Sequence, residues 1–308
     1  MKREYYKIYT DLAVEAKESF PGDGGEIPNV VLEEEEDKTS NMKITRVVIK
    51  NEEGAQAMGK PVGTYITLES SWILGDEEER HRCADSMADY LEELLPPSWE
   101  SILVVGLGNR DMTADSLGPK VVDALWVNRH LSKKKRGLSG LVPGVMAKTG
   151  METCEIVAGV VKEAKPDVVI VVDALAARSV KRLGVTIQLT NTGIMPGSGV
   201  GNHRNGINKD TIGVPVIAIG IPMVVGAATI ACDTLDALLD LFEKSEETKE
   251  LGHCLREFSE EEKFGLVREL LEPKFGPMYV TPKDVDESIG RLREVIAEGI
   301  NLAVYSKS

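Results

Sequence analysis

Two strongly apolar runs, each leading into a segment that carries an aspartate, constrain the fold of this chain most. Residues 101–105 read Ser-Ile-Leu-Val-Val, and residues 167–173 read Asp-Val-Val-Ile-Val-Val-Asp. Unbroken apolar runs are typical of parallel strands that helices cover on both faces. Two more strand-like runs and three helical patterns alternate with them, at 185–190, 214–220, 119–131, 149–165 and 228–244. The sequence therefore predicts an α/β fold with three layers, α/β/α, around a mostly parallel central sheet.

Weaker patterns flank this centre. Residues 43–50 and 63–69 are rich in β-branched side chains, and 76–95 has helical spacing that stops at Pro96. They predict a small N-terminal extension that contains β-strands. The acidic run 33–37 is expected to be a solvated face.

Two helix-start signals lie near the C-terminus. Ser259, followed by three glutamates, is a candidate N-cap. Thr281 followed by Pro282 is another, for a last helix that reaches about Val304. We expect one domain over residues 12–308, made of an N-terminal part, a core and C-terminal helices at 12–97, 98–244 and 245–308.

Charge and cysteine usage exclude several classes of protein. A net charge of −14 over 308 residues does not suit a protein that grips nucleic-acid phosphates. The four cysteines are dispersed without Cys-x-x-Cys spacing, which predicts neither disulfides nor a zinc site and fits a reducing cytoplasm. No run of about 18 apolar residues and no secretory signal is present, so no membrane partner is expected.

Asp115 and Asp173 are the best candidates for chemistry. Both follow apolar runs, and open α/β sheets keep their active sites at the carboxyl ends of strands. Two neighbouring carboxyl groups can share a proton, activate water and protonate a leaving amine. In the alternative interpretation each aspartate caps a helix, Asp115 the one near Pro119 and Asp173 a helical turn over 174–178. The residues alone leave this choice open.

Other motifs give weaker signals. Gly106-Leu-Gly-Asn109 lacks the third glycine of a dinucleotide-binding turn, and its glycines more plausibly let the loop fold over the strand end. The segment 196–201 is not a nucleophile elbow, because Pro196 and Val200 stand where glycines are needed. We expect a glycine-rich loop there whose residues shape a substrate groove or offer N–H donors, namely Gly197, Ser198 and Gly199.

Neither thiol nor metal chemistry is favoured. Cys154 could pair with His203 as nucleophile and base, but its apolar helical surroundings predict a buried structural thiol. The four histidines show no paired-ligand spacing. We therefore expect no metal ligands and no cofactor.

A series of motifs along the chain resembles the germination proteases of endospore-forming bacteria. They are residues 10–16, 106–109, 115–119, 143–146, 149–153, 165–179, 192–194, 196–202, 213–220 and 280–286. The resemblance implies a sequence-specific endopeptidase that degrades small acid-soluble spore proteins, lies in the forespore cytoplasm and assembles as a homotetramer. It also implies that Asp115 and Asp173 are the essential acids.

The same resemblance implies a zymogen that cleaves itself. Asp11-Leu12-Ala13 is similar to the acidic, large apolar and alanine residues at the family's cleavage sites in spore proteins. The expected cut after Asp11 would remove residues 1–11 as a propeptide, a basic and aromatic arm suited to an acidic groove. A disordered arm is the competing expectation.

A weaker resemblance to hydrogenase-maturation endopeptidases gives the alternative function. It rests on the Gly-x-Gly-Asn strand end and implies a metal-dependent maturation peptidase or a metal-recognising binding module. The chain also departs from many germination proteases, with Met195 in place of histidine, Gly226 in place of aspartate, and a shorter segment at 245–258.

Overall fold

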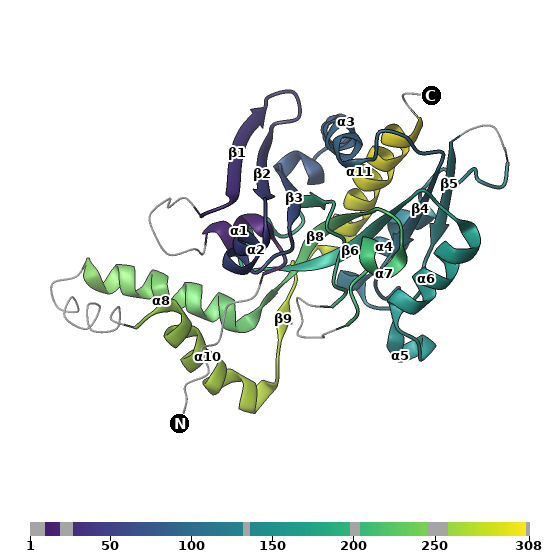
Figure 1. The fold of residues 1–308 in the computed structure, drawn as a ribbon. Coiled ribbons are helices and arrows are strands. Elements are labelled where there is room, and N and C mark those ends of the chain that lie inside the picture. Colours follow the sequence, from purple (N-terminus) through teal and green to yellow (C-terminus); the bar gives the residue numbers. More distant parts are fainter. Residues whose placement is uncertain (1–9, 19–26, 132–135, 198–203, 245–257, 306–308) are drawn as a thin grey trace.

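The computed structural model describes residues 10–18, 27–131, 136–197, 204–244 and 258–305. Nine strands in these ranges form one sheet, ordered β1-β2-β3-β7-β8-β6-β4-β5, with β9 pairing to β8 (Figure 1). Helices cover the sheet, and within the described ranges none is long and apolar enough to cross a membrane.

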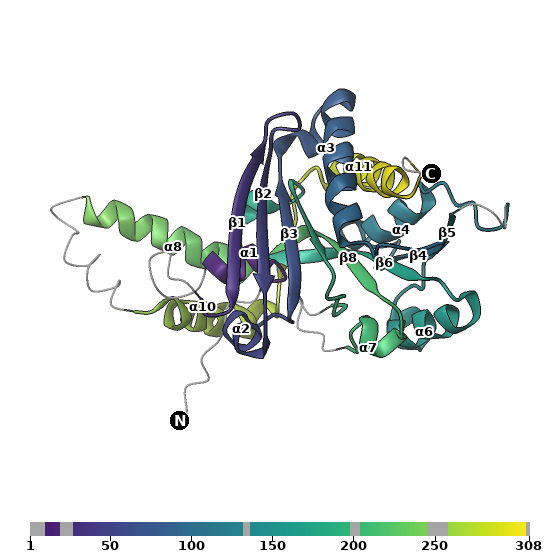
Figure 2. The same ribbon diagram turned by 45° about the horizontal axis from the view of Figure 1, so that its top comes forward.

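Four neighbouring strands of the sheet run parallel, and the last of them, β5, is an edge strand. They are β4 (Ser101–Gly106), β5 (Gly137–Leu141), β6 (Val168–Ala177) and β8 (Val216–Gly226). One face packs on α3 (Glu77–Leu94), α4 (Leu117–Asp123) and α11 (Val285–Tyr305). The other face packs on α6 (Thr153–Ala164) and the short α7 (Lys209–Ile212), as Figure 2 shows. The predicted three-layer α/β/α fold is confirmed.

The N-terminal strands continue this sheet in antiparallel fashion. The strands β1 (Val30–Asp37), β2 (Met42–Ile49) and β3 (Gly63–Glu69) reach the centre through β7 (Thr186–Thr190). Helices α1 (Ala13–Glu18) and α2 (Glu52–Met58) pack against them. The acidic run 33–37 is exposed, as expected, but it belongs to the edge strand β1 and not to a loop.

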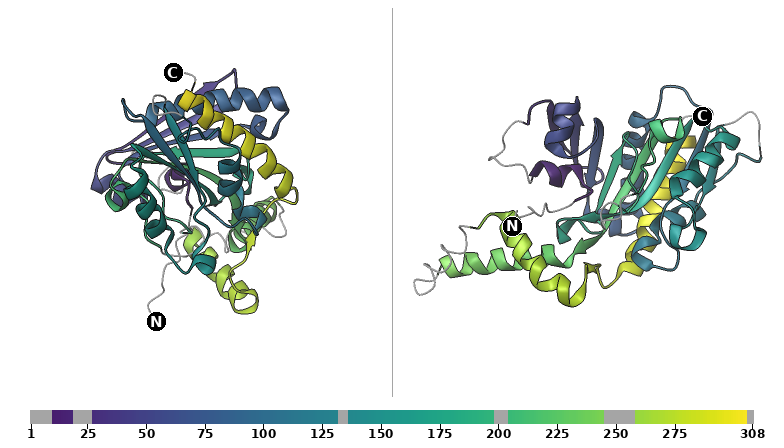
Figure 3. Two further views of the ribbon diagram at one scale, coloured as in Figure 1. Left: turned by 90° about the vertical axis from the view of Figure 1, so that its right-hand side faces the viewer. Right: turned by 60° about the horizontal axis from the view of Figure 1, so that its bottom comes forward.

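The C-terminal helices behave differently from one another. Helix α11 lies against the sheet, whereas α8 (Ala227–Glu243) packs with α10 (Glu260–Phe275) and both extend away from it (Figure 3). Ser259 caps α10 through a reciprocal bond with Glu262, which confirms that helix start. The predicted start at Pro282 is wrong: the two-residue strand β9 (Tyr279–Val280) precedes it, and α11 begins at Val285.

The helix expected at 119–131 is also shorter than predicted. Helix α4 ends at Asp123, because the backbone N–H of Trp126 donates to the Asn301 side chain of α11 at 3.1 Å and not to its own helix. The helix expected at 149–165 begins later than predicted, at Thr153 of α6, because Thr149 ends a short helix α5 (Met146–Thr149) and Gly150 at φ 70° follows it.

A carboxylate site at the ends of strands β4 and β6

A tight loop carries Asp115 over the end of β4. It contains Gly108 at φ 113°, where a Cβ atom would lie 2.0 Å from the main-chain oxygen of Asp115. The Asn109 N–H donates to that oxygen at 2.9 Å. Asp115 lies in a 3₁₀ turn, η2 (Thr113–Asp115), and Ser116 holds the N-cap position of α4, where its hydroxyl donates to the Thr113 oxygen at 2.8 Å and caps no helix N–H. The glycines therefore fold the loop over the strand end, as predicted, and Asp115 is not the cap of α4.

Asp173 lies within β6 and not at its end. The strand runs to Ala177 and stays paired with β8 throughout, with Asp173 opposite Gly220. The alternative interpretation, in which Asp173 caps a helical turn over 174–178, is therefore wrong. Pairing with β4 stops at Val172, so from Asp173 onward the edge of β6 that faces away from β8 is open.

One cavity brings the two aspartates together at this open edge. Asp115 and Asp173 both line it, with Arg204 and the predicted loop residue Gly197. Ser198 and Gly199 lie outside the described residues. The cavity walls also include the residues of the Leu107–Asn109 turn and Tyr279.

The two carboxyl groups titrate differently. Burial raises the pKa of Asp173 well above its ordinary value, and the nearby Asp115 and Asp11 carboxylates raise it further. Burial also raises the pKa of Asp115, but a hydrogen bond from the Asn109 backbone and the charge of Arg204 oppose that rise. On rising pH Asp115 therefore ionises first while Asp173 retains its proton.

The expected cleavage position lies at the same site. Asp11 lines the cavity and occupies the open edge of β6: its N–H donates to the Ala176 oxygen at 3.1 Å, and its carboxylate accepts the Ala176 N–H at 2.9 Å. Leu12 is fully buried against apolar side chains of β6 and β8, among them Leu175 and Val225. The resemblance predicted a cut here, whereas no motif or periodicity indicated that Asp11 would lie near the other two acids.

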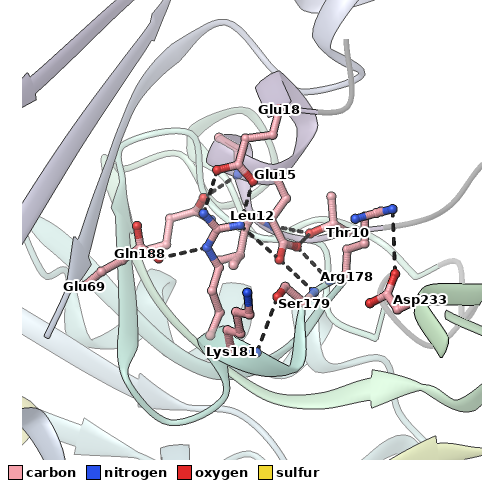
Figure 4. Close-up of polar contacts among 12 residues, drawn as sticks. Thr10, Leu12, Glu15, Glu18, Glu69, Arg178, Ser179, Lys181, Gln188 and Asp233 are labelled. Carbon is pink, nitrogen blue, oxygen red and sulfur yellow. Dashed lines mark hydrogen bonds and ion pairs between the residues drawn. The ribbon is translucent and has the colours of Figure 1, made fainter. Parts of the chain in front are cut away.

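A polar cluster fixes the chain on both sides of Leu12 (Figure 4). Glu15 of α1 is buried and accepts the backbone N–H groups of Arg178 and Ser179 at 2.7 and 2.9 Å. The Arg182 guanidinium pairs with Glu15 at 3.3 Å and with Glu18 at 2.7 Å. These contacts hold the segment 10–18 against the end of β6.

Two more polar side chains reach the expected scissile bond, and sequence reasoning missed both. Lys60 Nζ donates to the main-chain oxygens of Thr10 and Asp11 at 2.8 and 3.0 Å. The Gln188 side chain accepts the Ala13 N–H at 2.7 Å and donates to the Asp11 oxygen at 3.3 Å. Neither residue stands in a recognisable motif, so no local signal was available.

The remaining candidates lie apart from this chemistry or outside the described ranges. Cys154 is buried and its thiol donates to the Gly206 oxygen at 3.4 Å, as a structural thiol does, while His203 falls outside the described ranges. Met195 lines the carboxylate cavity, and Gly226 takes the N-cap position of α8. Across the described part of the chain, no group of three acidic, histidine or cysteine side chains is arranged to hold a metal ion.

Comparison with known sequences gives the family. The sequence model of the germination protease family matches residues 9–256 and 240–308. The chain belongs to the germination protease family. Membership in this family makes the protein a peptidase of spore germination.

Curated proteins named germination protease match this chain over nearly their whole length. The germination protease of Caldanaerobacter subterraneus subsp. tengcongensis is 46% identical, over 96% of this chain and 94% of its own. That of Clostridium perfringens is 44% identical, over 97% and 95%. That of Bacillus subtilis is 39% identical, over 98% and 94%.

Among solved structures, a NiFe hydrogenase maturation protease from Thermococcus kodakarensis is similar over part of the chain. It is 22% identical with a TM-score of 0.30, covering 44% of this chain and 80% of its own.

Proposed function

We propose that this family member is an endopeptidase in which Asp115 and Asp173 activate water for peptide hydrolysis. The observation that carries the proposal is the pairing of two carboxyl groups of unequal acidity in one cavity, beside an extended segment of chain on an open strand edge. Carboxyl pairs with separated pKa values divide the roles of acid and base between them.

The roles follow from the two pKa shifts. The Asp115 carboxylate takes a proton from water as the water oxygen bonds to the carbonyl carbon. The Asp173 carboxyl group gives its proton to the leaving nitrogen as the carbon–nitrogen bond breaks. Because no covalent intermediate forms, one turnover leaves the proton on Asp115, and exchange with solvent restores the starting state.

We further propose that the protein is made as a zymogen and cuts itself between Asp11 and Leu12. The segment is held by main-chain hydrogen bonds on the open edge of β6, which is how an extended peptide adds to a sheet. Removal of residues 1–11 would expose the part of the β6 edge to which Asp11 is hydrogen-bonded. Small acid-soluble spore proteins are the proposed substrates, in the forespore and spore core, with a homotetramer as the proposed assembly.

The test compares matched variants of the trimmed protein that begins at Leu12. A small acid-soluble spore protein is incubated with wild type, Asp115→Asn and Asp173→Asn in excess chelator. Asp111→Asn is the control, because Asp111 is an exposed acid of the same loop that pairs with Lys148. Single-site cleavage that persists in chelator and in Asp111→Asn, and disappears in the other two variants, supports the proposal. Loss in chelator would favour the metal-dependent alternative, and full activity of Asp115→Asn would contradict the assigned role.

A further inference from the structure

The main-chain oxygen of Asp11 accepts hydrogen bonds from two side chains that belong to different elements. Lys60 Nζ lies 3.0 Å from it and Gln188 Nε2 lies 3.3 Å from it. This oxygen belongs to the peptide bond between Asp11 and Leu12. A cation and an amide therefore both point at the carbonyl of the bond proposed to be cut.

Local structure positions both donors. Lys60 follows Gly59, which ends α2 in a left-handed conformation at φ 64°. The Lys60 N–H donates to the Ala55 oxygen at 3.2 Å. Pro61 follows, and its carbonyl accepts the Tyr65 hydroxyl at 2.9 Å. Lys60 is thus fixed between a helix end and a tethered proline, which limits where its ammonium group can reach.

Gln188 is oriented by its own second bond. It lies within β7 between Thr67 of β3 and Gly220 of β8, and it is 5% exposed. Its side-chain oxygen accepts the Ala13 N–H at 2.7 Å, so its amino group faces the Asp11 carbonyl. One amide therefore binds the chain on both sides of Leu12.

Asp11 lies where two cavities meet. The first holds Asp115 and Asp173, and the second is lined by Lys60, Gln188 and Asp11 itself. Leu175 and Met195 line both. The acids and the hydrogen-bond donors therefore line two different cavities that share Asp11.

We propose that Lys60 and Gln188 are catalytic residues that stabilise the negative oxygen formed during peptide hydrolysis. The inference rests on the proposed endopeptidase function. When water adds to the carbonyl carbon, the carbonyl π electrons move to the oxygen, which becomes an anion next to the Lys60 ammonium and the Gln188 amide. When the carbon–nitrogen bond breaks, the carbonyl re-forms and the Leu12 nitrogen takes the proton from Asp173. Donors aimed at developing charge act most strongly in the transition state.

The same pair defines how a separate substrate would bind. Its residue before the cut would place its carbonyl oxygen on Lys60 and Gln188. Its second residue after the cut would take the place of Ala13, whose N–H the Gln188 oxygen accepts in the uncut chain. These are main-chain contacts, so they set the register of the substrate and leave side-chain preference to the surrounding pockets.

The test measures kcat and KM separately, on the trimmed protein that begins at Leu12 with a peptide containing Thr-Asp-Leu-Ala. Removal of one such donor lowers kcat by about 100- to 1,000-fold in other hydrolases. We expect a loss of that order for Lys60→Met with little change in KM, a partial recovery in Lys60→Arg, and a smaller loss in Gln188→Met, which keeps much of the side-chain length and removes the donor without adding a negative charge beside the developing anion. Lys50→Met is the control, because Lys50 is an exposed lysine of the same extension.

The outcomes separate this inference from the function on which it rests. A kcat within twofold of wild type in Lys60→Met, or a rise in KM and a lower Tm with kcat unchanged, would overturn it. Thermal unfolding of every variant identifies any that fail to fold, and if Lys60→Met is one of them, the kcat of Gln188→Met gives an independent measure. If wild type itself does not cleave, or if Asp115→Asn cleaves fully, the proposed function fails first.

Discussion

The Glu15 carboxylate forms a buried ion pair with the Arg182 guanidinium, with 3.3 Å between Oε1 and Nη1. The pair joins α1, which begins one residue after Leu12, to the 3₁₀ turn η3 (Val180–Arg182) that follows β6. The backbone N–H groups of Arg178 and Ser179 and the Thr10 hydroxyl also donate to Glu15. This contact fixes the chain directly after the proposed cleavage site.

Glu15→Gln is expected to weaken that attachment. The substitution keeps the shape but removes a buried negative charge that Arg182 and two N–H groups share. Arg182 keeps its pairs with Glu18 and Glu69, so the cost is that of the buried N–H donors that lose their acceptor, about 1–3 kcal/mol. The free energy of unfolding in urea should fall by an amount of that order, and amide hydrogens of residues 10–18 should exchange faster. Glu163→Gln, at an exposed position of α6, should change stability by less than about 0.5 kcal/mol. Equal stability of both variants would show that the pair contributes nothing.

Asp173→Asn is expected to change the pH dependence of stability. The pKa of Asp173 is raised in the folded protein, so the folded state binds this proton more tightly than the unfolded state does. Between the unfolded pKa, about 4, and the folded pKa, wild type therefore loses stability as pH rises, by up to about 1.4 kcal/mol per pH unit. Asparagine cannot ionise, so the Asp173→Asn variant does not lose stability in this way.

Urea unfolding of both proteins at intervals from pH 4 to pH 8 measures the effect. The variant should gain on wild type as pH rises and show the smallest difference at pH 4. Asp111→Asn serves as the control, because Asp111 is an exposed aspartate of the loop that carries Asp115. Parallel curves for wild type and Asp173→Asn would contradict a raised pKa.

Gly108→Ala is expected to displace Asp115. At φ 113° an alanine is strained, and its Cβ would lie 2.0 Å from the Asp115 main-chain oxygen, so the loop must shift. Peptidase activity should fall by at least tenfold. Gly150→Ala is the matched control: its φ is 70° but a Cβ there meets no atom within 4 Å, so only the conformational cost of about 1–2 kcal/mol remains. Equal activity of the two variants would show that the close approach does not position Asp115.

The aspartate pair could be predicted because local sequence fixes it. The apolar runs 101–105 and 168–172 became neighbouring parallel strands, and adjacent parallel strands bring the segments after them to one edge. The length of β6 could not be predicted in this way. Ala174 to Ala177 favour helix by propensity, but pairing with β8 extends them as strand, and tertiary pairing overrides propensity.

The rest of the site depends on contacts between distant parts of the chain. Asp11 meets Ala176 across 165 residues, and Gln188 meets Ala13 across 175. Lys60 reaches Asp11 from the end of a helix whose sequence carries no catalytic pattern. Such contacts follow from the docking of the segment 10–18 on the sheet, which no periodicity or motif encodes.

The most direct test of the central claim follows the intact mass of the full chain over time. Wild type, Asp115→Asn, Asp173→Asn and Asp111→Asn are incubated in parallel, and the new N-terminus is sequenced. The account predicts that wild type and Asp111→Asn lose residues 1–11 and begin at Leu12, while the other two variants keep their full mass. Release of residues 1–11 from Asp115→Asn and Asp173→Asn at the wild-type rate, or a cut at another bond, would contradict it.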